Sequence, residues 1–247
     1  MGLLLIRNYF DTKIRVKEDL DRITSWPILG MIGHSNKETN LIVKEYPKSS
    51  LAESFRALRA NMKFIGGGGA RVIMFTSSIG GEGKTFNSIN LACALSLAQK
   101  KTILIGVDLR KPKIYNDFKL TNEKGLSSFL IGHDSKNEVI QHTELENLDM
   151  ISAGPIPPNP SELILSKEFH DLIESLKTEY EYVVLDTPPI GLVADSFELI
   201  KFVDYTFYVV RQNYTDKNLL RVLQERFSDE SKSKIGIVIN DYSVKGA

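Results

Sequence analysis

The fold is decided by one stretch of the chain, Thr76-Ser77-Ser78-Ile79-Gly80-Gly81-Glu82-Gly83-Lys84-Thr85. It follows an apolar run and leads into a helical pattern, which is the strand, glycine-rich turn and helix N-terminus of a phosphate-binding loop. In such a loop, successive backbone N–H groups and the positive end of the helix hold phosphates. The strict G-x-x-x-x-G-K-[ST] pattern fails at one position, where the small residue Ser78 replaces the first glycine. We therefore predict a nucleotide site at this stretch.

Apolar runs and helical patterns alternate along the chain on both sides of this loop. Strands are predicted at residues 72–76, 102–107, 148–152, 182–185, 205–210 and 235–239, and helices at residues 85–98, 167–177 and 217–227. Several of the runs are apolar at every position, which is typical of strands buried on both faces of a parallel sheet. The pattern predicts an α/β fold, a mostly parallel sheet flanked by helices, with ligand sites outside the carboxyl ends of the strands.

The first fifty residues are expected to be irregular, apart from one strand candidate at residues 28–32. A helix is predicted to begin at Ser50, because Ser50-x-x-Glu53 fits a capping box and an apolar stripe follows it. The stripe consists of Leu51, Phe55, Leu58, Met62 and Ile65, and four glycines at residues 66–69 end it as a flexible joint. We accordingly divide the chain into a juxtamembrane or N-terminal segment (1–49), an oligomerisation helix with its glycine joint (50–69) and the sheet domain (70–247).

Composition excludes several classes of protein. The chain of 247 residues has 31 basic and 31 acidic side chains, and this zero net charge argues against a nucleic-acid partner. Its one cysteine, Cys93, excludes an intramolecular disulfide and a cysteine-based zinc site. The four histidines are not spaced like a metal pair. No apolar run reaches the roughly 20 residues that span a bilayer.

Two aspartates at strand ends complete the predicted site. A Mg·ATP site needs carboxylates at the carboxyl ends of strands to hold the metal and its waters. Asp108 follows one apolar strand and Asp186 ends another. Each aspartate alone is about as often an ordinary helix cap, but together with the phosphate loop they favour a metal site. Lys84 is expected to reach the β and γ oxygens, and the Thr85 hydroxyl to bind Mg²⁺.

Two features of the sequence bear on the base of the nucleotide. The chain contains no Asn/Thr-Lys-x-Asp guanine motif, which favours ATP. Arg211 and Asn240 each follow an apolar run and are placed to touch adenine or ribose, although both could equally be turn residues. The predicted nucleotide-binding residues are therefore Gly80, Gly81, Glu82, Gly83, Lys84, Thr85, Phe86, Arg211 and Asn240.

Taken in order, the motifs resemble the bacterial tyrosine kinases (BY-kinases), the cytoplasmic domains of polysaccharide co-polymerases and P-loop proteins of the MinD/ParA-like group. The resemblance rests on five segments: the phosphate loop, Asp108-Leu109-Arg110-Lys111-Pro112, Asp186-Thr187-Pro188-Pro189, the E-x-x-R-x-x-R pattern at Glu53-Ser54-Phe55-Arg56-Ala57-Leu58-Arg59, and Pro157-Pro158-Asn159-Pro160-Ser161-Glu162-Leu163.

This resemblance implies an autophosphorylating protein-tyrosine kinase that uses Mg²⁺ and ATP and regulates capsule or exopolysaccharide export. Lys84, Asp108 and Asp186 would be catalytic, and Thr85 would bind Mg²⁺ together with the two aspartates. Subunits would assemble as a ring through Glu53, Arg56 and Arg59, although periodicity alone favours an ordinary solvated helix face for these three. Each subunit would phosphorylate tyrosines in its own or its neighbour's C-terminal tail.

The resemblance also recasts the apolar start, Gly2-Leu3-Leu4-Leu5-Ile6-Arg7, as the end of a membrane helix. It places the domain on the cytoplasmic face of the bacterial inner membrane. The implied partners are a membrane segment of the same full-length protein and a tyrosine phosphatase.

Two positions depart from the family pattern. The usual Asp-x-Asp of the second acidic motif has Gly106 at its first position, and the last thirty residues contain only one tyrosine, Tyr242. Two alternatives to an active kinase therefore stay open. One is a MinD/ParA-like ATPase switch, although Ile79 stands where those proteins carry a signature lysine. The other is a weakly active or inactive kinase that binds nucleotide as an assembly scaffold.

Overall fold

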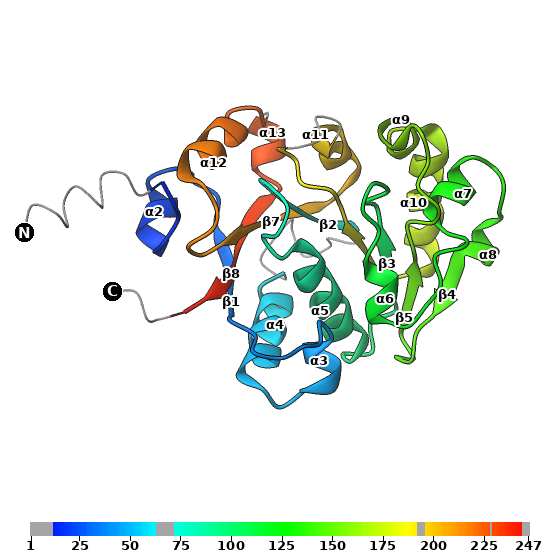
Figure 1. Cartoon of the computed structure of the whole chain (residues 1–247), viewed down its shortest axis with the longest axis horizontal. Coiled ribbons are helices and arrows are strands. Elements are labelled where there is room, and N and C mark those ends of the chain that lie inside the picture. The colour runs from blue at the N-terminus through cyan, green and yellow to red at the C-terminus, as the bar shows by residue number, and fades with distance from the viewer. Residues whose placement is uncertain (1–11, 63–71, 192–195, 228, 244–247) are drawn as a thin grey trace, which may run out of the picture.

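The computed structural model describes residues 12–62, 72–191, 196–227 and 229–243. Eight strands form one sheet in the order β1-β8-β7-β2-β6-β3-β5-β4, and only the edge pair β4–β5 is antiparallel. The sheet runs through the middle of the molecule, with helices above and below it (Figure 1). The strands are β1 (Ile28–Gly33), β2 (Val72–Ser77), β3 (Thr102–Gly106), β4 (Ile140–His142), β5 (Leu148–Ile151), β6 (Tyr182–Asp186), β7 (Tyr205–Arg211) and β8 (Ile235–Tyr242).

Alternation along the strands builds a core on each face of the sheet. In β2, Val72 and Met74 join one hydrophobic cluster, whereas Ile73 and Phe75 join the other. All six β2 residues are buried, because helices cover both faces. The continuously apolar runs are thus explained by two-sided burial, and the predicted mostly parallel α/β sheet is confirmed.

Three helices, α3 (Ile42–Glu45), α4 (Ser50–Asn61) and α5 (Lys84–Ser96), cover one face of the sheet (Figure 1). The opposite face is covered mainly by α10 (Lys167–Glu179) and α12 (Lys217–Gln224). The remaining short helices are α2 (Lys17–Asp21), α6 (Ile114–Asp117), α7 (Leu126–Leu130), α8 (Lys136–Val139), α9 (Pro160–Ile164), α11 (Ser196–Leu199), the 3₁₀ helix η3 (Ile200–Phe202) and α13 (Asp229–Lys232).

Helix α4 begins at Ser50 as predicted, but the predicted capping box is wrong. The N-cap is Ser49, whose hydroxyl accepts a hydrogen bond from Ala52 N at 3.1 Å. Glu53 instead accepts from the Arg56 guanidinium. Ser49 takes the cap because its backbone is extended whereas Ser50 is already helical. Of the predicted apolar stripe, Phe55, Leu58 and Met62 are buried.

The predicted segment boundaries cut across the sheet. β1, which lies in the segment 1–49, pairs in parallel with β8 and forms an edge of the same sheet. The predictions at Ile65, at the glycine joint and at the apolar start of the chain concern residues outside the described ranges. Within those ranges, no helix has the length and apolar character needed to cross a membrane.

Candidate nucleotide-binding and phosphoryl-transfer site

The phosphate loop lies between the end of β2 and the start of α5. Gly81 and Gly83 both have positive φ angles, of 85° and 98°, which glycine adopts without strain. Gly83 is the N-cap of α5, so the helix begins at Lys84. Ser78, at the position of the missing glycine, is not among the described residues with a positive φ, and its hydroxyl lies 2.9 Å from the Tyr208 hydroxyl. Serine therefore makes this turn without backbone strain, as predicted.

Lys84, Thr85 and Asp186 lie together at the carboxyl ends of the central strands. Asp186 ends β6 and stands in register with Phe75 of β2 and Gly106 of β3. Its Oδ2 accepts a hydrogen bond from the Thr85 hydroxyl at 2.8 Å. Its Oδ1 is buried and has no hydrogen-bond partner within the described part of the chain.

Burial also shifts the pKa values of Asp186 and Lys84 in the directions that favour their neutral forms. Desolvation raises the pKa of Asp186 to about 6, against the opposing effect of the Lys84 charge. Desolvation lowers the pKa of Lys84, against the opposing charges of Asp186 and Asp108. A bound group carrying both positive and negative charge would relieve both shifts.

Asp108 lies two residues beyond the end of β3 and is half-buried. Its Oδ1 accepts from the backbone N–H groups of Arg110 at 3.3 Å and Lys111 at 3.1 Å, so a local turn holds the carboxylate in place. Asp108 borders a cavity of about 310 Å³ that opens beside the phosphate loop. The cavity is lined by Gly80, Gly81, Lys84, Thr85, Asp108, Arg110, Lys111, Lys113, Pro188 and Pro189.

These residues fit a magnesium ion. The Thr85 hydroxyl and the carboxylates of Asp108 and Asp186 are hard oxygen donors, which Mg²⁺ prefers. All three residues line one small cavity of about 20 Å³, together with Gly106. A buried carboxylate oxygen without a partner is costly in a native protein, and a metal ion at the Oδ1 of Asp186 would remove that cost.

A second cavity, of about 210 Å³, lies on the β1 and β8 side of the loop. It is lined by Gly33, His34, Ser35, Lys37, Thr39, Asn40, Phe86, Arg211, Asn240 and Asp241. Three of the residues predicted to bind the nucleotide, Phe86, Arg211 and Asn240, are therefore brought together at one cavity. Asn240 Nδ2 donates to the Glu82 carbonyl oxygen at 3.0 Å, which holds the end of β8 against the phosphate loop.

Glu82 was predicted to bind the nucleotide, but its side chain lines neither cavity. It is fully buried, where Oε2 accepts from Ile79 N at 2.8 Å and Oε1 accepts from the Thr215 hydroxyl. Burial raises the pKa of this carboxyl, against the effect of those hydrogen bonds. The Glu82 carboxylate thus holds the phosphate loop through its hydrogen bonds to Ile79 N and Thr215. Only the backbone of Glu82 is left to contact a ligand.

The E-x-x-R-x-x-R residues make contacts within their own chain. Glu53 is exposed and pairs with Arg56 at 2.5 Å. Arg56 also donates to the Pro47 carbonyl oxygen, and Arg59 donates to the Ala94 carbonyl oxygen in the last turn of α5. Both arginines are half-buried.

Several lining residues were missed by the sequence reasoning. Arg110 and Lys111 were quoted as part of a motif but given no role, and Lys113 was not considered. Their closeness to Asp108 was a usable signal. His34 and Lys37 gave none, because only the pairing of β1 with β8 carries them to the cavity.

Comparison with known proteins adds independent evidence. A family model described as an AAA domain matches residues 70–214. Tyrosine-protein kinase YwqD of Bacillus subtilis is 34% identical over 83% of this chain and 87% of that protein. Putative tyrosine-protein kinase CapB of Staphylococcus aureus is 33% identical over 81% of this chain and 88% of that protein.

Comparison with solved structures gives the same family. The chimerical protein CapA2B2 superposes with a TM-score of 0.85 at 38% identity, over 92% of this chain and 99% of that one. The kinase domain of Escherichia coli ETK gives a TM-score of 0.86 at 28% identity, over 95% and 97%. MinD of Pyrococcus horikoshii gives 0.55 at 21% identity, over 68% of this chain and 67% of that one, and shows a shared fold alone. The fold, the motif order and these likenesses together show that the chain belongs to the family of bacterial tyrosine-protein kinases that includes YwqD and CapB.

Proposed function

We propose that this protein is an ATP-dependent protein-tyrosine kinase that autophosphorylates and regulates the assembly and export of capsular or exopolysaccharide. The observation that carries the proposal is the buried, unpartnered Oδ1 of Asp186, next to the Thr85 hydroxyl and the phosphate loop. The family relationship supplies the reaction class, since the relatives are named tyrosine-protein kinases.

In this proposal, Thr85, Asp186 and Asp108 hold Mg²⁺, and the phosphate loop holds the triphosphate of ATP. When bound, the metal neutralises charge on the phosphate oxygens. Lys84 is buried beside this position, so its ammonium stabilises negative charge without first losing a shell of water. Phe86, Arg211 and Asn240 line the cavity that would take the nucleoside.

The reaction forms a bond between the γ-phosphorus and the tyrosine hydroxyl oxygen and breaks the bond from that phosphorus to the β–γ bridging oxygen. ADP leaves with the electron pair of the broken bond. The phenol proton needs an acceptor, and Asp108 is suited to this role because its carboxylate borders the open cavity. Asp186 is enclosed and already accepts a hydrogen bond from the Thr85 hydroxyl, which suits it to the metal.

The assembly is also part of the proposal. Glu53, Arg56 and Arg59 would join subunits into a ring on the cytoplasmic face of the inner membrane. The acceptor would be a C-terminal tyrosine tail of the same or a neighbouring subunit, reversed by a tyrosine phosphatase. A membrane segment of the same full-length protein would hold the ring in place. Glu53 supports this role because it is exposed and its one charge partner in the described chain is Arg56.

One incubation tests the activity. A version that carries a tyrosine-rich tail is incubated with Mg²⁺ and ATP, and both phosphotyrosine and free phosphate are measured. Phosphotyrosine is the expected product. Phosphate release without phosphotyrosine would instead favour an ATPase switch, and nucleotide binding without either product would favour a scaffold.

The scaffold is the second candidate, and the packing at Gly106 favours it. A Cβ atom at this position would lie 3.1 Å from Ile114 Cγ2 and 3.3 Å from Ala153 N. The backbone is therefore packed closely where the family pattern carries an aspartate. If one carboxylate fewer leaves the metal poorly held, the protein would bind nucleotide but transfer phosphate slowly.

A further inference from the structure

We propose that residues 211–215, the last residue of β7 and the turn that follows it, form a clasp that positions the phosphate loop, and that Thr215 and Tyr214 are positioning residues for nucleotide binding. We call residues 211–215 the clasp loop. The proposal rests on the proposed function for its ligand, a nucleotide, but its test also works if no phosphate is transferred.

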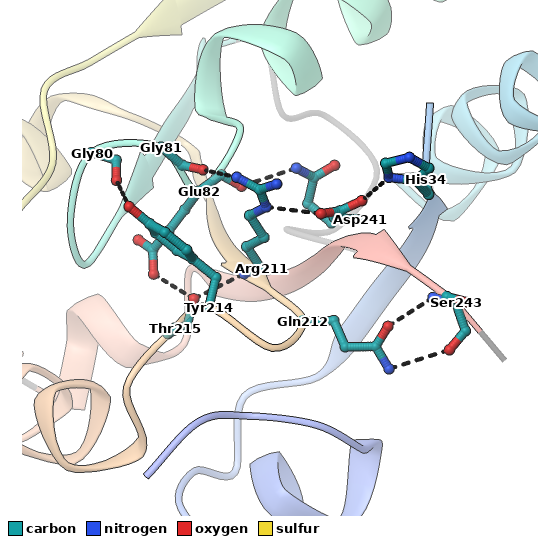
Figure 2. A network of polar contacts seen from close by, with 11 residues as sticks. His34, Gly80, Gly81, Glu82, Arg211, Gln212, Tyr214, Thr215, Asp241 and Ser243 are labelled. Carbon is teal, nitrogen blue, oxygen red and sulfur yellow. Dashed lines mark hydrogen bonds and ion pairs between the residues drawn. The ribbon is translucent and has the colours of Figure 1, made fainter. Parts of the chain in front are cut away.

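The clasp loop holds three consecutive residues of the phosphate loop. Tyr214 OH donates to the Gly80 carbonyl oxygen at 3.0 Å, and Arg211 Nη1 donates to the Gly81 carbonyl oxygen at 3.0 Å. The Thr215 hydroxyl donates to the Glu82 carboxylate. Figure 2 shows the three contacts arranged along one side of the phosphate loop.

These contacts orient the backbone of the phosphate loop. When the carbonyl oxygens of Gly80 and Gly81 are held by the clasp, the loop has one preferred conformation before a ligand arrives. Preorganised N–H groups bind an anion more tightly than flexible ones, because ordering the loop no longer costs free energy on binding. The expected effect of the clasp is therefore on nucleotide affinity.

The contact between Thr215 and Glu82 is the central one because it is buried. Thr215 is fully buried, and its hydroxyl accepts from Arg211 N at 2.9 Å while it donates to Glu82. The other Glu82 oxygen holds Ile79 N at 2.8 Å, inside the phosphate loop itself. Loss of the Thr215 hydroxyl leaves one oxygen of a buried carboxylate without its donor, which is the costly way to break a hydrogen bond.

The far side of the clasp loop is fixed by the N-terminal segment. Ile14 N donates to the Thr215 carbonyl oxygen at 3.0 Å, and Asn213 N donates to the Ile14 carbonyl oxygen at 2.8 Å. Gln212 Nε2 donates to the Arg15 carbonyl oxygen at 2.6 Å. The clasp loop is thus hydrogen-bonded to the N-terminal segment on one side and to the phosphate loop on the other.

The test compares Thr215→Val, which keeps the shape but removes the hydroxyl, with Thr215→Ser, which keeps the hydroxyl. We expect Thr215→Val to weaken the binding of Mg·ADP in calorimetry about tenfold. If phosphotyrosine forms, the KM for ATP should rise by a similar factor while kcat changes less than about threefold. Thr215→Ser should restore both within about twofold.

A matched control is Thr206→Val. Thr206 is a fully buried threonine of β7, the strand before the clasp turn, and its Oγ1 has no hydrogen-bond partner among the described residues. This variant should bind Mg·ADP like the wild type. Wild-type affinity in a folded Thr215→Val, or equal losses in Thr215→Val and Thr206→Val, would overturn the clasp.

A second variant covers the case in which Thr215→Val does not fold. Tyr214→Phe removes one exposed contact and leaves both the buried one and Arg211, which lines the nucleoside cavity. Mg·ADP should then bind about two- to fivefold more weakly, and unchanged affinity would overturn the clasp. Tight Mg·ADP binding by the wild type without phosphotyrosine would defeat the proposed kinase but leave the clasp standing.

Discussion

The two sides of the phosphate loop differ in how well their polar groups are satisfied. On the side of Asp186 and the cavity of about 310 Å³, which we call the cavity side, the Oδ1 of Asp186 is buried without a partner in the described chain. Burial there shifts the pKa values of Asp186 and Lys84 in the directions that favour their neutral forms. On the clasp side, both oxygens of the buried Glu82 carboxylate accept hydrogen bonds, and the Thr215 hydroxyl both donates and accepts. The phosphate loop thus lies between an unsatisfied carboxylate, that of Asp186, and a satisfied one, that of Glu82.

This difference distinguishes the residues that would bind a ligand from the residues that hold the phosphate loop in place. Buried polar groups in native proteins are nearly always paired, so a group left unpaired is explained by a missing partner. Under the proposed function a metal and an anion complete the cavity side, whereas on the clasp side the Glu82 and Thr215 side chains have partners within the chain. Changes on the cavity side should therefore remove function, and changes on the clasp side should weaken it.

The largest expected effect is that of Lys84→Met. Without the buried ammonium, charge that develops on the transferring phosphoryl group loses its nearest counter-charge, and phosphotransfer should fall about a hundredfold to a thousandfold. Phosphotyrosine formation by a tail-bearing version measures the loss. Lys100→Met is the control, since Lys100 is exposed and paired with Glu181; it should retain full activity. Normal phosphotyrosine in Lys84→Met would refute the assignment of the site.

Asp186→Asn should separate function from stability. Phosphotransfer should fall at least about a hundredfold, but the nucleotide-free protein should become more stable near neutral pH. The reason is that folding raises the pKa of Asp186 from its ordinary value to about 6. Above pH 6 the native state carries a buried charge that the unfolded chain solvates better, so the wild type should lose stability as pH rises from about 4 to 6.

The shift of about two pKa units corresponds to at most about 3 kcal/mol. Thermal unfolding of both proteins without nucleotide, between pH 4.5 and 8, measures the difference. The Asn variant should have the higher Tm at pH 7.5, with a gap that narrows toward pH 4.5. A constant gap across this range would contradict the assigned titration.

Gly106→Asp tests whether the cavity side tolerates a third carboxylate. The new Cβ atom would press on Ile114 and Ala153, so both Gly106→Ala and Gly106→Asp should lose about 1–2 kcal/mol of unfolding free energy in urea. The aspartate should lose more than the alanine, because its charge lies close to those of Asp108 and Asp186. We expect no gain in phosphotransfer from Gly106→Asp. A higher kcat in that variant would show that the missing aspartate limits the reaction.

The cavity side could be predicted from the sequence, and the clasp side could not. Lys84, Thr85 and Asp186 belong to local motifs, and the rule that parallel strands end at one edge brings them together. Helix and strand positions were predicted within a few residues because buried parallel strands have a strong apolar signature. The short strand β4 and the short helices escaped because three to five residues carry too little periodicity.

The hydrogen bonds between the clasp loop and the phosphate loop join residues that are more than one hundred positions apart in the sequence. Thr215 meets Glu82 only because β7 pairs with β2, and the order of strands in the sheet is not written in any local pattern. For the same reason the partner of the Glu82 side chain could not be predicted, and Glu82 was only predicted to bind the nucleotide as part of the phosphate loop. Its neighbours in sequence belong to the phosphate loop, but its side-chain partner comes from a distant turn.

The smallest expected effect is that of Tyr214→Phe, which sharpens the comparison within the clasp itself. The hydroxyl bond to Gly80 is lost, but the ring remains close to the Arg211 guanidinium, whose Cζ lies 5.2 Å from the ring centroid. Tyr214 is 37% exposed, so water can replace the lost donor at Gly80. A solvated neutral hydrogen bond contributes about 0.5–1 kcal/mol, and Mg·ADP should bind only two- to fivefold more weakly.

Tyr46→Phe is the matched control, because Tyr46 is 39% exposed and also lies under a cation, that of Lys37. It should bind Mg·ADP like the wild type. If Tyr214→Phe costs as much Mg·ADP affinity as Thr215→Val, then the burial of a clasp contact does not determine how much it contributes to the affinity. The exposed bond to the Gly80 carbonyl oxygen and the buried bond to Glu82 would then contribute equally to holding the phosphate loop.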